Sequence, residues 1–293
     1  MTTRTLLALT CACLSGFPID GSDASASERP NFVFILVDDL GYADLGCYGS
    51  SFYDTPHLDA FASMVHAMDE NVGRLLAKLD ELDLSKNTVV MFTSDNGGLT
   101  TKPGKNTPTS VRPLRAGKGW CYEGGIRVPW IIRAPGVTKP GAKCETPIYS
   151  ADAYPTILEL AGLDARPNQH QDGRSLAGLL KGETSPERDF IVWHYPHYHG
   201  SNWRPGSAIR AGKWKLVEHY DYGKVELFNL EEDLGEQTDL SEKLPEKAKE
   251  LRRKMHDYLK SVNAKLPEPN PAFDKSGGDA GKPARKKKRK KKA

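Results

Sequence analysis

The chain has 293 residues, of which 38% are hydrophobic, and its formal net charge at pH 7 is +3. Eight positive charges lie in the run RKKKRKKK at residues 285–292, and without them the net charge becomes −5. This length suits one main core with a smaller subdomain. Because the net positive charge comes from that run, it gives no reason to expect nucleic-acid binding. The mature chain has no run of about 18 apolar residues, so we expect no transmembrane helix in it.

The first residues resemble a secretory signal. Arg4 precedes the apolar segment LLALTCACL, and ASA at residues 24–26 supplies small residues for cleavage. We therefore expect residues 1–26 to be a signal peptide and the protein to be exported, to the periplasm or outside the cell. The mature chain would keep an odd number of cysteines, so at least one thiol has no partner within it; they are Cys47, Cys121 and Cys144.

The next segments alternate between strand and helix patterns. NFVFILVDDLG at residues 31–41 is continuously apolar before its acids, which is typical of a strand buried on both faces of a parallel sheet. NTVVMFTSDNGG repeats the plan at 87–98, RVPWIIRAPG predicts a third strand at 127–136, and SADAYPTILELAGL predicts a helix at 150–163. Residues 27–185 should thus form an α/β core, a mostly parallel sheet flanked by helices.

A long helical pattern connects the first two strands. TPHLDAFASMVHAMDENVGRLLAKLDEL at residues 55–82 has apolar residues at steps of three and four, including Leu58, Phe61, Val65 and Met68. This spacing predicts one amphipathic helix that is unusually long for a globular protein.

After residue 185 the pattern changes to short strands. These are FIVWHY, GSAIRAGKWKLVEHY and KVELFNL, and Asp221 and Gly223 predict a hairpin between the last two. PEKAKELRRKMHDYLKSV predicts a final helix with Pro245 near its first position. We expect residues 186–265 to form a C-terminal subdomain of a small antiparallel sheet plus a helix, and residues 266–293 to form a disordered basic tail.

Oxygen-bearing side chains follow the first two strands, with Asp38 and Asp39 after one and Asp95 and Asn96 after the other. Ligands of parallel sheets bind beyond the carboxyl ends of strands, and such a set suits Ca²⁺, or less well Mg²⁺. The alternative is that these are ordinary turn residues. Lys118 lies between two glycines and offers a compact cation for sulfate or phosphate, although a surface turn would give the same pattern.

Several segments together resemble the sulfatase family, of the arylsulfatase type with an alkaline-phosphatase-like fold. They are RPNFVFILVDDLGYADLGCYG, TPHLDA, MVHAMDENVGRLL, NTVVMFTSDNGG, PLRAGKGWCYEGGIRVPWIIRAPG, DAYPTILELAGL, GSAIRAGKWKLVEHY and VELFNLEEDLGEQTDL. They cover most of residues 29–265 in the expected order. The resemblance implies hydrolysis of sulfate esters, with sulfated carbohydrate as the expected substrate. It also implies calcium ligands at Asp38, Asp39, Asp95 and Asn96 and a sulfate contact at Lys118.

The same comparison of motifs exposes a missing element. The family's nucleophile is a cysteine in C-x-P-S-R that is oxidised to formylglycine, and neither this block nor the following G-Y-x-T-x-x-x-G-K-x-H block occurs in the chain. In the family both lie between segments that here touch at Ser63 and Met64, so we expect an internal deletion near 63–64. Cys47 lacks the neighbouring Pro and Arg and is interpreted as structural, and Thr55 before Pro56 as a helix cap.

Three hypotheses follow. The chain is a sulfate-ester hydrolase, a catalytically dead relative that binds sulfated glycan, or a truncated or mispredicted product whose gene would show an excised segment. Hydrolases of phosphate esters with the same fold are a further alternative.

Two other features have an open interpretation. WHYPHYHGSNW at residues 193–203 could be a substrate-facing loop through His197, His199 and Trp203, or the packed aromatic edge of the subdomain. The basic run at 285–292 is typical of a solvated extension, and we also consider contact with a polyanion.

Overall fold

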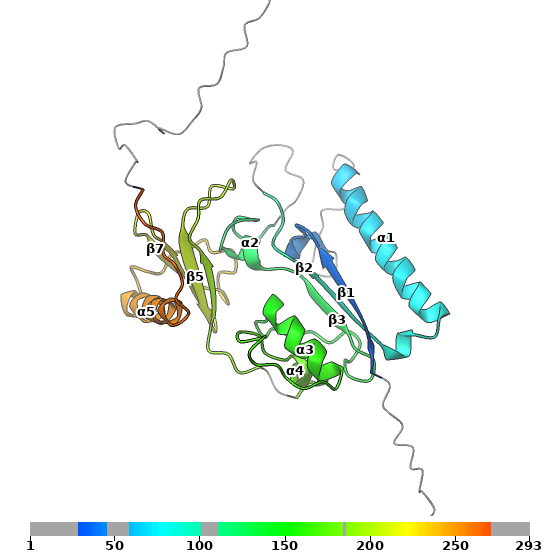
Figure 1. Ribbon diagram of the computed structural model, residues 1–293. Helices are drawn as coiled ribbons and strands as arrows, with labels where there is room; N and C mark the ends of the chain where they lie inside the picture. Colours follow the sequence, from blue (N-terminus) through cyan, green and yellow to red (C-terminus); the bar gives the residue numbers. More distant parts are fainter. Residues whose placement is uncertain (1–28, 46–58, 101–110, 184–185, 271–293) are drawn as a thin grey trace, which may run out of the picture.

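The computed structural model describes residues 29–45, 59–100, 111–183 and 186–270, without the side chains of residues 59–63, and it contains two separate sheets (Figure 1). The sheet nearer the N-terminus, sheet A, has the strand order β1-β2-β3, and sheet B has the order β4-β5-β6-β7. The predictions for the signal peptide, Cys47, Thr55 and the run at 285–292 lie outside the described residues.

Sheet A is mixed. Strands β1 (Asn31–Val37) and β2 (Thr88–Ser94) pair in parallel along their whole length, whereas β3 (Trp130–Arg133) pairs with β2 antiparallel. Every residue of the central β2 is buried, but β1 leaves Phe34 43% and Leu36 58% exposed. The predicted α/β class is confirmed, with parallel pairing limited to the two strands whose acidic ends carry the site.

Two short helices cover one end of sheet A. They are α3 (Ala153–Leu160) and α4 (Ala177–Lys181). Ile157 and Leu160 of α3 pack against a small core that includes Val89 and Met91 of β2. Burial of these aliphatic side chains supplies the apolar contact that attaches α3 to the sheet, and α4 contacts α3.

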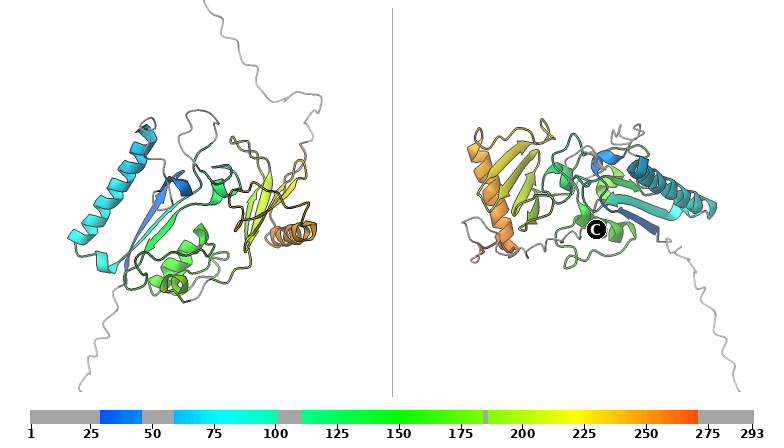
Figure 2. Two further views of the ribbon diagram at one scale, coloured as in Figure 1. Left: turned by 180° about the vertical axis from the view of Figure 1, so that it is seen from behind. Right: turned by 90° about the horizontal axis from the view of Figure 1, so that it is seen from above.

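Helix α1 (Asp59–Glu81) is continuous across residues 63 and 64, as the apolar period predicts. It nevertheless packs weakly, because no side chain between Met64 and Glu81 is buried. The residues of its apolar stripe are only half-buried, and they are Val65, Met68, Val72, Leu76 and Leu79. Figure 2 shows α1 on the outer flank of sheet A, at the opposite side of the molecule from α5. The sequence therefore encodes a helix here without encoding a deep contact for it.

Sheet B is an antiparallel meander of β4 (Ile191–Tyr195), β5 (Gly206–Ala211), β6 (Trp214–His219) and β7 (Val225–Asn229). Helix α5 (Pro245–Ser261) packs on one face, where Leu251, Met255 and Leu259 contact the inward side chains of the central strands. The segment predicted as one strand, GSAIRAGKWKLVEHY, is in fact two. Gly212 divides it, because its φ of +56° permits a tight turn between β5 and β6.

The hairpin predicted at Asp221 and Gly223 is present. The backbone N–H of His219 donates to the carbonyl of Lys224 at 2.8 Å, which closes the turn between β6 and β7. Gly223 has a φ of +66°, a conformation that glycine adopts without strain.

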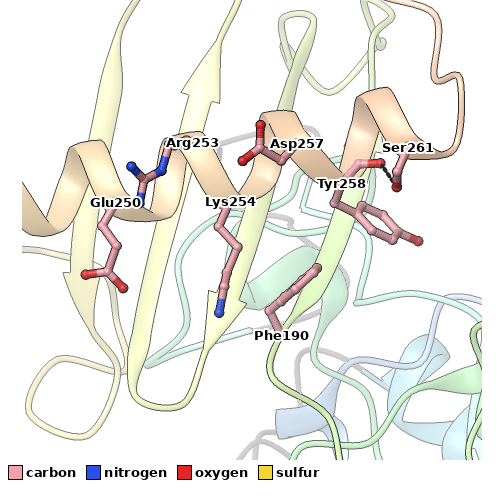
Figure 3. Close-up of a pocket in the computed structure, with 7 residues that line it drawn as sticks. All are labelled: Phe190, Glu250, Arg253, Lys254, Asp257, Tyr258 and Ser261. Carbon is pink, nitrogen blue, oxygen red and sulfur yellow. Dashed lines mark hydrogen bonds between the residues drawn. The ribbon is translucent and has the colours of Figure 1, made fainter.

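A shallow hollow of about 470 Å³ lies along one side of α5, between the helix and Phe190 (Figure 3). Its lining mixes charges, with Arg253 and Lys254 beside Glu250 and Asp257, and the Lys254 ammonium lies 5.2 Å from the centre of the Phe190 ring. Because neither sign of charge prevails, this hollow is a poor candidate for an anion or metal site. No helix among the described residues is long and apolar enough to cross a bilayer.

Candidate metal and anion site

The parallel register of β1 and β2 brings their acidic ends together. The backbone N–H of Asp39 donates to Oδ1 of Asp95 at 3.0 Å, and Nδ2 of Asn96 donates to Oδ1 of Asp39 at 2.8 Å. Residues predicted from the strand ends alone therefore lie at one edge of the sheet, as the rule for parallel sheets implies.

Three carboxylates form the centre of this cluster. One oxygen each of Asp38, Asp39 and Asp95 lies within 4.8 Å of the others, roughly twice a calcium–oxygen distance. The charges of Asp39 and Asp95 raise the pKa of Asp38 above its ordinary value, a sign that negative charge is concentrated here. Hard oxygen donors at this spacing and with this charge fit a divalent cation such as Ca²⁺.

Asp39 is held in an unusual conformation between these groups. Its φ is +60°, in the left-handed region that Asp tolerates better than most residues. The next residue is fixed by Ser94, whose Oγ accepts the backbone N–H of Leu40 at 3.1 Å and donates to the carbonyl of Val37 at 2.9 Å. The end of β2 thus fixes the turn that aims Asp39 at the cluster.

Lys118 completes the cluster from a third segment. Its ammonium donates to Oδ1 of Asp39 and lies 3.7 Å from Oδ1 of Asp38, and its backbone N–H donates to the carbonyl of Gly98 at 3.0 Å. The hydrogen bond to Asp39 raises the pKa of Lys118. For Asp39, burial raises the pKa, but the hydrogen bonds from Lys118 and Asn96 outweigh burial and lower it. Both groups are therefore charged at neutral pH.

Close backbone packing joins the two loops of the site, and the sequence analysis missed it. The N–H of Gly97 donates to the carbonyl of Gly125 at 3.0 Å, and a Cβ on Gly97 would lie 1.9 Å from the carbonyl oxygen of Gly124. Only glycine fits such an approach. The paired glycines of DNGG and EGGI were the available signal.

The aromatic segment after β4 divides between core and surface. Trp203 is 1% exposed, donates from Nε1 to the carbonyl of Tyr195 at 3.0 Å and packs edge-to-face on Trp120. It therefore belongs to the packed aromatic edge of the subdomain rather than to a substrate-facing loop. His197 is exposed. His199 lies against the loop of Lys118, because a Cβ on Gly119 would be 2.1 Å from its Nδ1. Of these three residues, His199 therefore contacts the residue next to Lys118.

Arg127 has a structural contact. Its Nε donates to Oε2 of Glu123 at 2.7 Å, and its guanidinium lies 5.6 Å from the centre of the Tyr42 ring. It therefore links the segment after Lys118 to the loop after β1.

Two family models match the chain. The model described as Sulfatase matches residues 57–163, and the model described as N-sulphoglucosamine sulphohydrolase, C-terminal, matches residues 116–265. Among curated relatives, a sulfatase of Formosa agariphila is 34% identical over 266 residues, covering 82% of this chain and 47% of the relative. Arylsulfatase A of Homo sapiens is 34% identical, covering 66% of this chain and 37% of the relative.

Solved structures agree. Ps i-CgsB has a TM-score of 0.61 at 29% identity, over 78% of this chain and 48% of that one, and it has also been solved in complex with k-i-k-neocarrahexaose. BT4656, in complex with D-glucosamine-2-N,6-O-disulfate, has a TM-score of 0.55 at 27% identity, over 68% of this chain and 39% of that one. The chain thus spans less than half the length of each of these proteins.

Proposed function

The chain belongs to the sulfatase family, with its alkaline-phosphatase-like fold, and from that premise we propose that the cluster binds Ca²⁺ beside a sulfate ester. The cation ligands would be Asp38, Asp39, Asp95 and Asn96, and Lys118 would contact the sulfate. The observation that carries the proposal is the placement of one lysine ammonium within 3.7 Å of two of these carboxylates.

The arrangement separates two tasks. Carboxylate and amide oxygens would hold the cation, which when bound would polarise the sulfate oxygens. Lys118 would neutralise an oxygen of the ester, while Asn96 keeps Asp39 in place. Sulfated carbohydrate is the proposed substrate class, supported by the ligands of the structures of Ps i-CgsB and BT4656. His199 would meet the sugar from the side of Gly119, and exposed His197 would be a more distant contact.

Hydrolysis of the ester is the reaction that the family implies. It requires a nucleophile, and the sequence has no C-x-P-S-R block from which formylglycine could form. That observation favours a second candidate function for the chain as printed, namely binding of sulfated glycan without turnover. We propose that the internal deletion near residues 63–64 removed the nucleophile block, so that the chain as printed keeps binding and lacks turnover.

The test measures binding and turnover separately. Calorimetry with CaCl₂ and then with a sulfated sugar should show binding that Asp39→Asn abolishes, whereas Asp69→Asn on the exposed side of α1 should leave it intact. An aryl sulfate assay with calcium should show no turnover by the chain as printed. Turnover that survives both Asp39→Ala and Lys118→Ala would refute the site assignment, and equal calcium binding by Asp39→Asn and the wild type would refute the cation site.

We also propose the chain organisation that the sequence indicates: a leader at 1–26 that directs export, a core at 27–185, a subdomain at 186–265 and a basic tail at 266–293. The run at 285–292 would hold a polyanion such as sulfated polysaccharide by charge. Retention of the chain on such a polymer should fall steeply as salt rises, because salt screens exposed charges. Retention that salt does not alter would contradict this role.

A further inference from the structure

A buried ionic cluster connects sheet B to the segment that follows Lys118. Nζ of Lys215, on β6, lies 2.9 Å from Oε1 of Glu123 and 2.8 Å from Oε1 of Glu236. Glu123 opens the short helix α2 (Glu123–Ile126), and Glu236 lies in the segment after β7. The side chain of Lys215 is 0% exposed and the two carboxylates are at most 3% exposed. Charges so deeply buried persist only when each has its partners.

The cluster also fixes the backbone of α2. Oε2 of Glu236 accepts the backbone N–H of Glu123 at 2.7 Å, so the first residue of the helix is held through both its side chain and its main chain. From α2, the N–H of Gly124 donates to the carbonyl of Arg115 at 2.9 Å, three residues before Lys118. The carbonyl of Gly125 accepts the N–H of Gly97, the neighbour of Asn96. Helix α2 therefore contacts both loops of the candidate site.

We propose that Lys215 is a positioning residue for the candidate site. Through Glu123 and Glu236 it fixes α2, and through α2 it sets the separation of the loops that carry Asn96 and Lys118. An apolar side chain of similar volume would fill the same space but would not orient two carboxylates. The inference rests on the proposed function, which assigns cation and sulfate binding to these two loops. The link from Lys215 to the loops consists of the contacts given above.

The experiment compares Lys215→Met and Glu236→Gln with Arg252→Met in the full chain. Arg252 is the matched control, because it also pairs with a buried acid of β6, Glu218, but connects that strand to α5. The first readout is amide hydrogen exchange of peptides covering residues 95–98 and 115–126. The second is affinity for Tb³⁺, a luminescent calcium probe.

We expect both cluster variants to raise the exchange of these two peptides about tenfold and to weaken Tb³⁺ binding about tenfold, as loss of outer-shell support does at metal sites. Exchange of α5 should stay unchanged in both, and Arg252→Met should leave the site peptides and Tb³⁺ affinity within about twofold of the wild type. Thermal unfolding measures global stability. If Lys215 had only a structural role, the variants would lower the melting temperature without a selective rise in exchange at residues 95–98 and 115–126.

Unchanged exchange at residues 95–98 and 115–126 in Glu236→Gln, or in a folded Lys215→Met, would overturn the inference. If Lys215→Met does not fold, Glu236→Gln decides, because it removes one of the two carboxylate charges that Lys215 orients and keeps a side chain of the same size. Equal Tb³⁺ affinity in the wild type and Asp39→Asn would instead refute the proposed function. In that case the exchange readout still decides whether Lys215 positions the loops.

Discussion

Nδ2 of Asn96 lies 2.8 Å from Oδ1 of Asp39, although 57 residues separate the two in the sequence. The ammonium of Lys118 donates to the same oxygen, so three loops converge on one atom of Asp39. That oxygen is already shared by two donors, and a cation that binds Asp39 competes with Lys118 for it. Because of this competition, we expect removal of the Lys118 ammonium to change the affinities for cation and for anion in opposite directions.

Lys118→Met should strengthen cation binding and weaken sulfate binding. Removing a positive charge less than 4 Å from two carboxylates relieves repulsion of a cation by about 1 kcal/mol, or roughly five- to tenfold in affinity. The same change removes the cationic contact for the ester. Calorimetric titrations with CaCl₂ and with a sulfated sugar measure both effects, and Lys86→Met, on an exposed surface, is the control. Weaker calcium binding in Lys118→Met would contradict this account of Asp39.

Glu123 should make stability depend on pH in the acid range. Burial raises its pKa, but Lys215 and Arg127 outweigh burial and lower the pKa from 4.5 to about 2. A lowered pKa contributes stability that is complete above the unfolded value and is lost as pH falls toward the folded one, here between about 4.5 and 2. Urea unfolding at pH 7, 4 and 3 should show this loss in the wild type and a flatter profile in Glu123→Gln.

Glu236 should act with the opposite sign, although it binds the same lysine. Burial dominates and raises its pKa, so its contribution is greatest below the unfolded value of 4.5 and falls as pH rises through the folded pKa. Glu236→Gln should therefore flatten the dependence of the free energy of unfolding on pH above 4.5, a range in which Glu123→Gln should not flatten it. Parallel profiles for the two variants would show that the two acids are not distinguished in this way.

Ala116→Gly should stabilise the protein by up to about 1 kcal/mol. Ala116 has a φ of +61°, in the left-handed region that side chains other than glycine adopt at a cost. Glycine relieves this left-handed strain, although its greater freedom in the unfolded chain offsets part of the gain. Chemical denaturation measures the change, and Ala77→Gly in the exposed face of α1 should be neutral or destabilising. A loss of stability in Ala116→Gly would refute the strain argument.

Gly73→Ala should slow amide hydrogen exchange in α1 without changing the melting temperature of the rest of the protein. Gly73 is exposed within the helix, and a Cβ there would meet no atom within 4 Å, so the gain is the helix preference of about 0.5–1 kcal/mol. Because α1 packs weakly, this gain should appear as slower amide exchange in α1 alone. Gly97→Ala is the contrasting variant, since its Cβ would collide with the carbonyl of Gly124.

Trp203→Ala should destabilise the protein by about 3–5 kcal/mol, as for other buried aromatic residues. His197→Ala, at an exposed position of the same segment, should change stability by less than about 0.5 kcal/mol. Thermal and urea unfolding compare the two. A stable Trp203→Ala variant with lost sugar binding would restore the substrate-facing interpretation of Trp203.

The sequence was most informative where a local pattern decides the structure. Continuous apolar runs predicted β1 and β2, and the carboxyl-end rule predicted the proximity of Asp39 and Asp95. The direction of β3 depends on the route of a long connection, which no local pattern encodes. Lys215 is the clearest miss, because it alternates with Trp214 and Leu216 as a solvent-facing residue would. It is buried because sheet B is covered on both faces, by α5 and by the segment containing Cys121 and Tyr122.

The edge of β1 has a practical consequence for handling the protein. Among the described residues β1 pairs with β2 alone, so no described strand pairs with its outer edge, and β1 also exposes the side chains of Phe34 and Leu36. An apolar strand with an open edge is a template for pairing with another chain. We therefore expect self-association that grows with protein concentration, and a charged residue in place of Leu36 should suppress it while leaving the loops around Asp39 intact.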